Sequence, residues 1–381
     1  MDMPAATTNA VDAVESLDRH LSRQSSDPSR SATFDMEDGP EREVLKPFAI
    51  LKRAVASLDE LVTVAWRAAD RSALRHQAEH RLLARVAIMA GTTAIALAIV
   101  QLAVRLTRPD WSTGPAILEA VAVTAGTVAI GVGLTTKHDK KWLGQRHLAE
   151  RLRMLKFQAL CRPDLWSGKS EAWDSWVRNQ IGLLKGADDY ERINAWTLSG
   201  KAEIDDPAMV SDSVEPQSAH ALAVYYRHKR LAYQASYFDR QSARYAREAG
   251  PLQHISVPLF LASVVMVLIH FGSDLLSERL GVGAESAVTS LKLIAGWSAA
   301  LAAILPVISI GVRGWMNAFE LPRSSSLYAA KGRALGIASV HLIHDQGDFA
   351  ATLRHAARDE HFLENEHREW LRLLREAEWF F

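Results

Sequence analysis

The stretch AVAVTAGTVAIGVGLTTKHDKKWLGQRHLAERLRMLK, residues 120 to 156, places two opposite kinds of sequence side by side. Its first fifteen residues carry no charge, and its last twenty-two carry seven lysines and arginines. The whole chain is neutral, with 44 basic and 44 acidic side chains in 381 residues. So much positive charge directly after an apolar run needs a physical reason, and that reason decides the fold class.

Four long apolar runs stand out along the chain, at residues 86–104, 116–136, 255–272 and 293–312. Each is close to the roughly 20 residues that a helix needs to cross a hydrocarbon layer. A soluble helix of this length normally has one polar face, which these runs lack. The sequence therefore predicts an all-α integral membrane protein with four transmembrane helices. Four buried helices of a large soluble core are the alternative.

The distribution of lysine and arginine predicts the orientation, because basic residues are retained on the cytoplasmic side of membrane segments. Nineteen lie in the flanks of the two pairs of runs, and four lie in the connections within the pairs. We therefore expect two helical hairpins, with the N and C termini in the cytoplasm. The basic residues of 135–156 then anchor the second span at the headgroups, at about 1 kcal/mol each. A basic patch also fits nucleic-acid binding, but here it abuts a span, so we expect no nucleic-acid partner.

Outside the apolar runs, hydrophobic residues recur at three-, four- and seven-residue steps, which predicts helices that pack as in coiled coils, within or between subunits. The single cysteine excludes an internal disulfide and suits a reducing compartment. The predicted segments are a disordered polar tail over 1–45, a first helical hairpin unit over 46–160, a cytoplasmic connector with an acidic linker over 161–217, a second hairpin unit over 218–345, and a C-terminal amphipathic helix over 346–381.

Three short motifs resemble one group of bacterial proteins. WLGQRHLAERLR, residues 142–153, is similar to the W-x3-R-x2-A-E-x-L-R pattern of SLATT-type membrane proteins. RLAYQASYF, residues 230–238, and ENEHREW, residues 364–370, resemble patterns in the membrane half of bacterial TRPM-like SLOG proteins. The matching residues include Trp142, Arg146, Glu150, Arg153, Arg230, Gln234, Tyr237, Glu364, Glu366 and Trp370.

The resemblance implies a function in bacterial defence. It implies a homo-oligomeric effector or channel of the bacterial inner membrane that permeabilises the cell on a cytoplasmic nucleotide-type signal. The N-terminal residues are too few for the SLOG domain of those relatives, so the signal would be a nucleotide ligand or come from a separate nucleotide-sensing protein. The alternative is a non-conducting, membrane-anchored scaffold or sensor that recruits a cytoplasmic partner. A transporter is disfavoured, because the spans hold few polar residues for a substrate site.

The predicted spans contain one acid and two stripes of small residues. Glu119 either lines a pore or reaches the interface by snorkelling, because it lies about one turn from Gly114 and Pro115. Small residues at four-residue spacing let membrane helices approach closely, although an alanine-rich sequence also produces this spacing by chance. The expected contact seams are Ala125, Ala129 and Gly133 in one span and Ala295, Ala299 and Ala303 in another.

The motif residues have two interpretations. Arg146, Glu150 and Arg153 lie on one helical face at four- and three-residue spacing, which favours a salt-bridge network over a ligand site. Tyr226, Tyr233 and Tyr237 near Arg230 are expected to pack between helices by default, and stacking on a nucleotide or a lipid headgroup is the alternative.

The sequence gives little sign of catalysis. HLIHDQGD, residues 341–348, could hold a metal, but histidines and acids at this spacing are common on solvated helices, so we expect no metal. P-loop, nucleophile-elbow and dinucleotide-binding motifs are absent from the sequence. We therefore expect neither a cofactor nor an enzyme.

Overall fold

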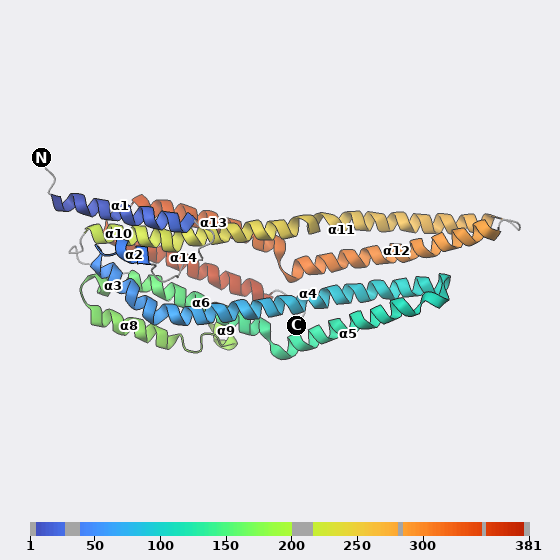
Figure 1. Cartoon of the computed structure of the whole chain (residues 1–381), viewed down its shortest axis with the longest axis horizontal. Helices are drawn as coiled ribbons and strands as arrows, with labels where there is room; N and C mark the ends of the chain where they lie inside the picture. The colour runs from blue at the N-terminus through green and yellow to red at the C-terminus, as the bar shows by residue number, and fades with distance from the viewer. Residues whose placement is uncertain (1–4, 27–38, 200–215, 281–284, 345–347, 377–381) are drawn as a thin grey trace. The chain divides into compact units, whose positions relative to one another are not determined.

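The computed structural model describes residues 5–26, 39–199, 216–280, 285–344 and 348–376. These residues are helical nearly throughout, and the described ranges contain no strand (Figure 1). They fall into two compact units. Unit 1 holds the described residues of 1–77, 139–242 and 326–376, and unit 2 those of 78–138 and 243–325. Each half of the sequence contributes to both units, so the predicted boundaries at 160 and 217 do not coincide with those of compact units.

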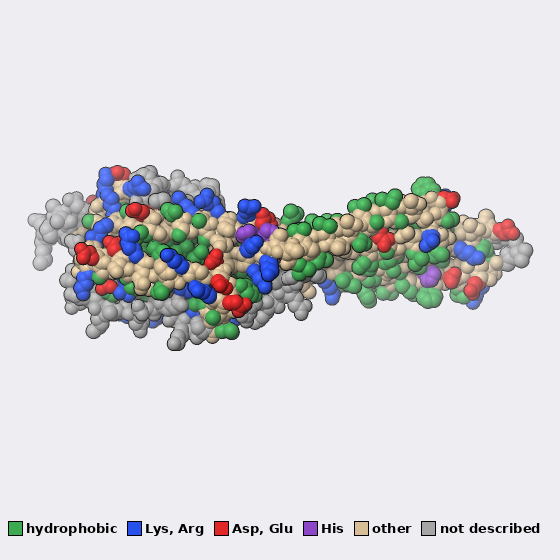
Figure 2. Space-filling model, turned by 90° about the horizontal axis from the view of Figure 1, so that it is seen from below, with side chains coloured by type: hydrophobic (Ala, Val, Ile, Leu, Met, Phe, Trp, Pro, Cys, Tyr) green, Lys and Arg blue, Asp and Glu red, His purple; other side chains and the backbone are tan. Residues whose placement is uncertain are grey.

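Four helices are long and apolar enough to cross a membrane, and they contain the four apolar runs. In the most apolar window of each, only 11% to 17% of the residues are buried inside the chain, so most of the apolar side chains face outward. Figure 2 shows hydrophobic side chains gathered over these helices. The elements concerned are α4 (Val64–Thr107), α5 (Thr113–Thr136), α11 (Tyr233–Arg279) and α12 (Glu285–Ala318), with the short η2 (Pro109–Trp111) before α5.

Within unit 2, polar side chains on α11 contact backbone carbonyls of α12. Ser263 donates a hydrogen bond to the carbonyl of Ala302 at 2.7 Å, and His270 Nδ1 lies 3.0 Å from the carbonyl oxygen of Ala295. The residue numbers rise along α11 as they fall along α12, so the two helices run antiparallel. Helix α11 continues through Pro258, which apolar helices tolerate where neighbouring groups satisfy the freed carbonyl.

The apolar helix α5 stops where the basic segment begins. Lys137 takes a left-handed conformation, with φ of 51°, and its N–H bonds to the carbonyl of Gly133. A left-handed residue just after a helix is a common way to end it. The next helix, α6 (His138–Leu160), starts at once and carries the first sequence motif.

Unit 1 is a helical assembly around one hydrophobic core. Helix α6 ends in that core, where the indole N–H groups of Trp173 and Trp166 donate to the carbonyls of Ala159 and Leu160 at 2.7 and 2.9 Å. Carbonyls in the last turn of a helix lack partners within it, so these bonds satisfy groups that burial would otherwise penalise. The remaining elements are α1 (Ala5–Ser26), α2 (Gly39–Val44), α3 (Ala49–Leu58), η1 (Asp59–Thr63), α7 (Pro163–Trp166), α8 (Ser170–Leu183), α9 (Tyr190–Ser199), α10 (Pro216–Tyr226), η3 (Arg227–Ala232), α13 (Leu321–His344) and α14 (Phe349–Glu376).

The prediction of a disordered tail over residues 1–45 is wrong for its described part. Helix α1 packs on α10, and Val14, Leu17 and Leu21 are buried on one of its faces. Its polar composition conceals this three- and four-residue spacing of apolar side chains. In the predicted connector, residues 163–199 form α7, α8 and α9, and most of the acidic linker lies outside the described residues.

Gly144 offers a test of the packing in unit 1. A Cβ on Gly144 would lie closer than 3.0 Å to the backbone carbonyl of Asp188, a distance that real Cβ atoms essentially never show. We expect Gly144→Ala to destabilise the protein by about 1–3 kcal/mol through overpacking. Gly182 in α8 has open space around it, so Gly182→Ala should be neutral or stabilise by up to about 1 kcal/mol. Thermal unfolding in detergent compares them, and equal midpoints would contradict the close approach.

Candidate functional site

Two wide helical turns bring charged residues into the core of unit 1. The segments η1 and η3 are π-helical, a rare geometry that concentrates at functional sites. Asp59 of η1 lies 3.3 Å from Lys156 Nζ, and Lys229 of η3 lies 2.6 Å from a carboxylate oxygen of Glu41. All four side chains are at most 7% exposed. Burial lowers the pKa of Lys156, although Asp59 opposes that change.

The most extensively bonded pair joins η3 to α14. Arg230 donates to both oxygens of Glu360, with N–O distances of 2.6 and 2.8 Å, and the two side chains are 2% and 1% exposed. The hydroxyl of Tyr226 donates to the same carboxylate at 2.9 Å. The guanidinium lies 5.1 Å from the centroid of the Phe157 ring. Two-point pairing, a third donor and an aromatic neighbour are what a buried ion pair needs to offset its desolvation.

The first sequence motif forms a second ionic group. Arg146 contacts Asp70 at 3.1 Å and Glu150 at 2.5 Å, and Arg153 contacts Glu150 at 3.0 Å. The Arg153 guanidinium lies 5.4 Å from the ring centroid of Trp66. Burial alone would raise the pKa of Glu150, but Arg146 and Arg153 outweigh it and lower the pKa to about 2. The salt-bridge interpretation of this motif agrees with the observed contacts.

Helix α14 contributes the third motif to the same unit. Glu364 pairs with Arg368 at 2.7 Å, Glu366 pairs with Lys331, and Trp370 packs edge-on against Trp142 with ring centroids 6.1 Å apart. The three motifs are far apart in sequence, and all three lie in unit 1.

Two buried histidines lie within this group. His147 Nδ1 and His367 Nε2 are 3.0 Å apart, and the planes of the two rings are nearly parallel, at 7°. Burial lowers the pKa of both histidines, that of His367 to about 3, so both rings are neutral near pH 7. One ring must therefore donate to the other.

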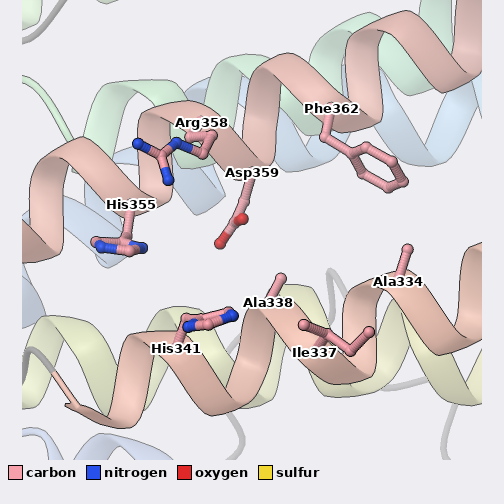
Figure 3. A pocket seen from close by; sticks show the side chains of 8 residues that line it. All are labelled: Ala334, Ile337, Ala338, His341, His355, Arg358, Asp359 and Phe362. Atoms are coloured by element: carbon pink, nitrogen blue, oxygen red, sulfur yellow. The ribbon is translucent and has the colours of Figure 1, made fainter.

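A pocket of about 290 Å³ opens between α13 and α14. Its walls combine apolar and polar side chains, and Asp359 points from α14 into the space between the two helices (Figure 3). Asp359 is 8% exposed, and its Oδ2 atom has no hydrogen-bond partner. Burial, and then the charge of Glu360, raise the pKa of Asp359 to about 7, while Arg358 and Arg230 act in the opposite direction. The lining residues are Ala334, Ile337, Ala338, His341, His355, Arg358, Asp359 and Phe362.

The sequence analysis identified some of the buried polar residues of unit 1 and missed others. Gln234 is buried, and Tyr237 packs against the hydrophobic core. The sequence analysis missed Asp59, Lys156, Lys229, Glu360 and the histidine pair. Asp359 was missed as well. It lies in the sequence RDEH, and four consecutive charged or polar residues in a helix look the same in the sequence whether they are buried or exposed to solvent. For the metal hypothesis, His341 lies in the pocket, and the side chains of His344 and Asp345 are outside the described part.

In unit 2 the six predicted seam residues differ in burial. On α5, Ala129 and Gly133 are buried together with Ala122 and Gly126, but Ala125 is exposed. The buried face is therefore rotated from the predicted one. On α12 only Ala295 of the three predicted residues is buried, while Ala299 is half-buried and Ala303 exposed. Glu119 is half-buried, and its role stays a prediction.

Comparison of the chain with protein-family models, with curated proteins and with solved structures finds no match. The SLATT-type resemblance thus rests on the sequence motifs alone.

Substitution of Glu150 tests whether the buried ion pairs of unit 1 stabilise the fold. Glu150→Gln would leave Arg146 and Arg153 buried without their shared counter-charge, which should cost about 3–5 kcal/mol of unfolding free energy. The matched control is Glu43→Gln, because Glu43 and Lys46 form a pair that is 64% and 58% exposed. That change should cost no more than about 0.5 kcal/mol. Urea or thermal unfolding measures both, and similar losses would contradict a buried network.

The raised pKa of Asp359 predicts that the stability of the protein depends on pH. Its pKa is raised from the ordinary 3.8 to about 7, so between these values the folded state holds a proton that the unfolded chain has lost. Stability therefore falls as pH rises toward 7, and the loss is complete above it. Asp359→Asn removes the ionisation, so it should raise the unfolding free energy by about 1–3 kcal/mol more at pH 8 than at pH 5. A difference that does not change with pH would show that the carboxyl titrates normally.

Proposed function

We propose that this protein is an oligomeric effector of the bacterial inner membrane that permeabilises the bilayer in response to a cytoplasmic nucleotide-type signal. Unit 2 would lie in the membrane as two helical hairpins, and unit 1 with both termini would lie in the cytoplasm. The nineteen-to-four distribution of basic residues supports this orientation.

The observation that carries the proposal is the continuity of the long helices. Helix α4 runs without a break from Val64 to Thr107, and α11 from Tyr233 to Arg279. Each begins directly after a π-helical turn that carries a buried ion pair in unit 1, and each contains an apolar run in unit 2. A change at the buried ion pairs of unit 1 would therefore reach two apolar helices along the continuous backbone of α4 and α11, as gating by a cytoplasmic signal requires.

Exposed apolar residues support an oligomer. Val64 and Leu74, in the unit 1 part of α4, are 65% and 54% exposed although they lie outside the apolar run. A second subunit would cover such side chains. A cytoplasmic partner would cover them equally well, and this keeps the membrane-anchored scaffold as the second candidate.

Ala129 tests the proposed pore. Ala129→Leu would separate α5 from its neighbours, because Ala129 is 4% exposed on the buried small-residue face, and we expect about a tenfold loss of conductance in planar bilayers. Ala120→Leu is the matched control, since Ala120 lies on the exposed side of the same helix. It should conduct like the unmodified protein.

The bilayer recordings, together with a measurement of membrane potential in cells, distinguish the channel from the scaffold. Bacterial cells that express the unmodified protein should lose membrane potential when the signal is present, which a voltage-sensitive dye reports. Silent bilayers together with an unchanged potential would reject the channel and favour the scaffold, whose recruited partner would be lost on deletion of residues 346–381.

A further inference from the structure

The pocket between α13 and α14 contains the one buried acid of described α14 that has no ion-pair partner. Glu360, Glu364 and Glu366 each pair with a basic side chain. Asp359 lies beside them at 8% exposure, with Oδ2 unpartnered. An unsatisfied buried acceptor destabilises the folded state, so the fold alone gives no reason for a carboxyl group here.

On one side of this carboxyl group the pocket wall is apolar and open to solution, and His341 and His355 line the other end of the pocket (Figure 3). Ile337 is 61% exposed and Phe362 is 39% exposed, and Ala334 and Ala338 complete the apolar lining. In Figure 3 the Phe362 ring lies along the same gap into which Asp359 points. Apolar walls with a few inward polar groups are typical of small-molecule sites, and about 290 Å³ is near their lower size limit.

The chemistry of the carboxylate selects the ligand. An ionised carboxylate only accepts hydrogen bonds, and its two oxygens match a planar pair of N–H groups. An aromatic ring attached to that pair would pack against Phe362 and Ile337. An anionic ligand would instead place its charge against Asp359. A metal ion would have to bind next to the positive charge of Arg358.

We propose that this pocket binds a small aromatic or heteroaromatic molecule that presents an amidine-like pair of N–H groups to the carboxylate of Asp359. Arg358, which is exposed on the pocket wall, would contact any anionic substituent that the ligand carries on its outer side. The proposal names a ligand class for the signal in the proposed function. Binding, however, is measured without reference to conductance, so failure of one does not imply failure of the other.

The direct test is binding of benzamidine to the full-length protein in detergent, measured by calorimetry or by ligand-observed NMR. Benzamidine carries the amidine group on one aromatic ring, and benzoate is the matched probe with the opposite charge. We expect saturable binding of benzamidine and none of benzoate. Asp359→Asn should weaken benzamidine binding about tenfold or more, because a hydrogen bond to a charged group is lost.

Two further variants complete the test. Phe362→Ala should weaken binding several-fold through loss of the apolar wall, and it provides an independent measurement if Asp359→Asn folds poorly. Glu369→Gln, an exposed acid on the same helix, should bind like the unmodified protein. Absence of benzamidine binding, equal binding by Asp359→Asn, or binding of benzoate that Arg358→Gln abolishes would each overturn the proposal.

Discussion

The packing of unit 1 depends on the buried ion pair between Arg230 and Glu360. These two residues are 130 positions apart in the chain, yet each is nearly inaccessible to solvent. A buried charge that loses its partner costs several kcal/mol, so neither residue is tolerated in the core unless the other is in place. Helix α14 is therefore required for η3 to sit in the core at all, and the surrounding pairs of Glu150 and Glu364 extend the same dependence to α6 and α9.

In a membrane, unit 2 would obey a different constraint, because helices in lipid gain little from hydrophobic contact with each other. A small-residue contact, in which a Cβ on Gly126 would lie 3.4 Å from the Cβ of Ala90, and short polar bonds provide contacts instead. Ser256, Ser263, His270 and Ser277 recur every seven residues along α11, and the two middle ones bond to carbonyls of α12. Apolar side chains such as Leu268 and Phe271 stay exposed on the helix surface. The polar residues thus form one stripe along an otherwise apolar helix.

The sequence predicted the helices better than their assembly. Length and hydropathy were enough for the four apolar helices, because both quantities can be read from the sequence without knowledge of the tertiary fold. Motif spacing was enough for the Arg146–Glu150–Arg153 contacts, because they lie within one helix. The partners of Arg230 and Lys156 could not be predicted, since pairing across 130 and 97 positions depends on the tertiary fold. Helix α1 was missed although Val14, Leu17 and Leu21 have helical spacing, because composition was given more weight than periodicity.

The two π-helical turns also set the rotational phase of the long helices. An α-helix advances by about 100° per residue, so one extra residue in a turn rotates everything after it by about that angle. Twenty-three positions separate Thr63, the end of η1, from Val86, and the same number separate Ala232, the end of η3, from Ile255. In each half of the chain, the π-helical turn therefore shifts the rotational phase of the helix at the same distance before the apolar run. The residues before each turn and the residues of the following helix therefore lie on faces that an uninterrupted α-helix would not align.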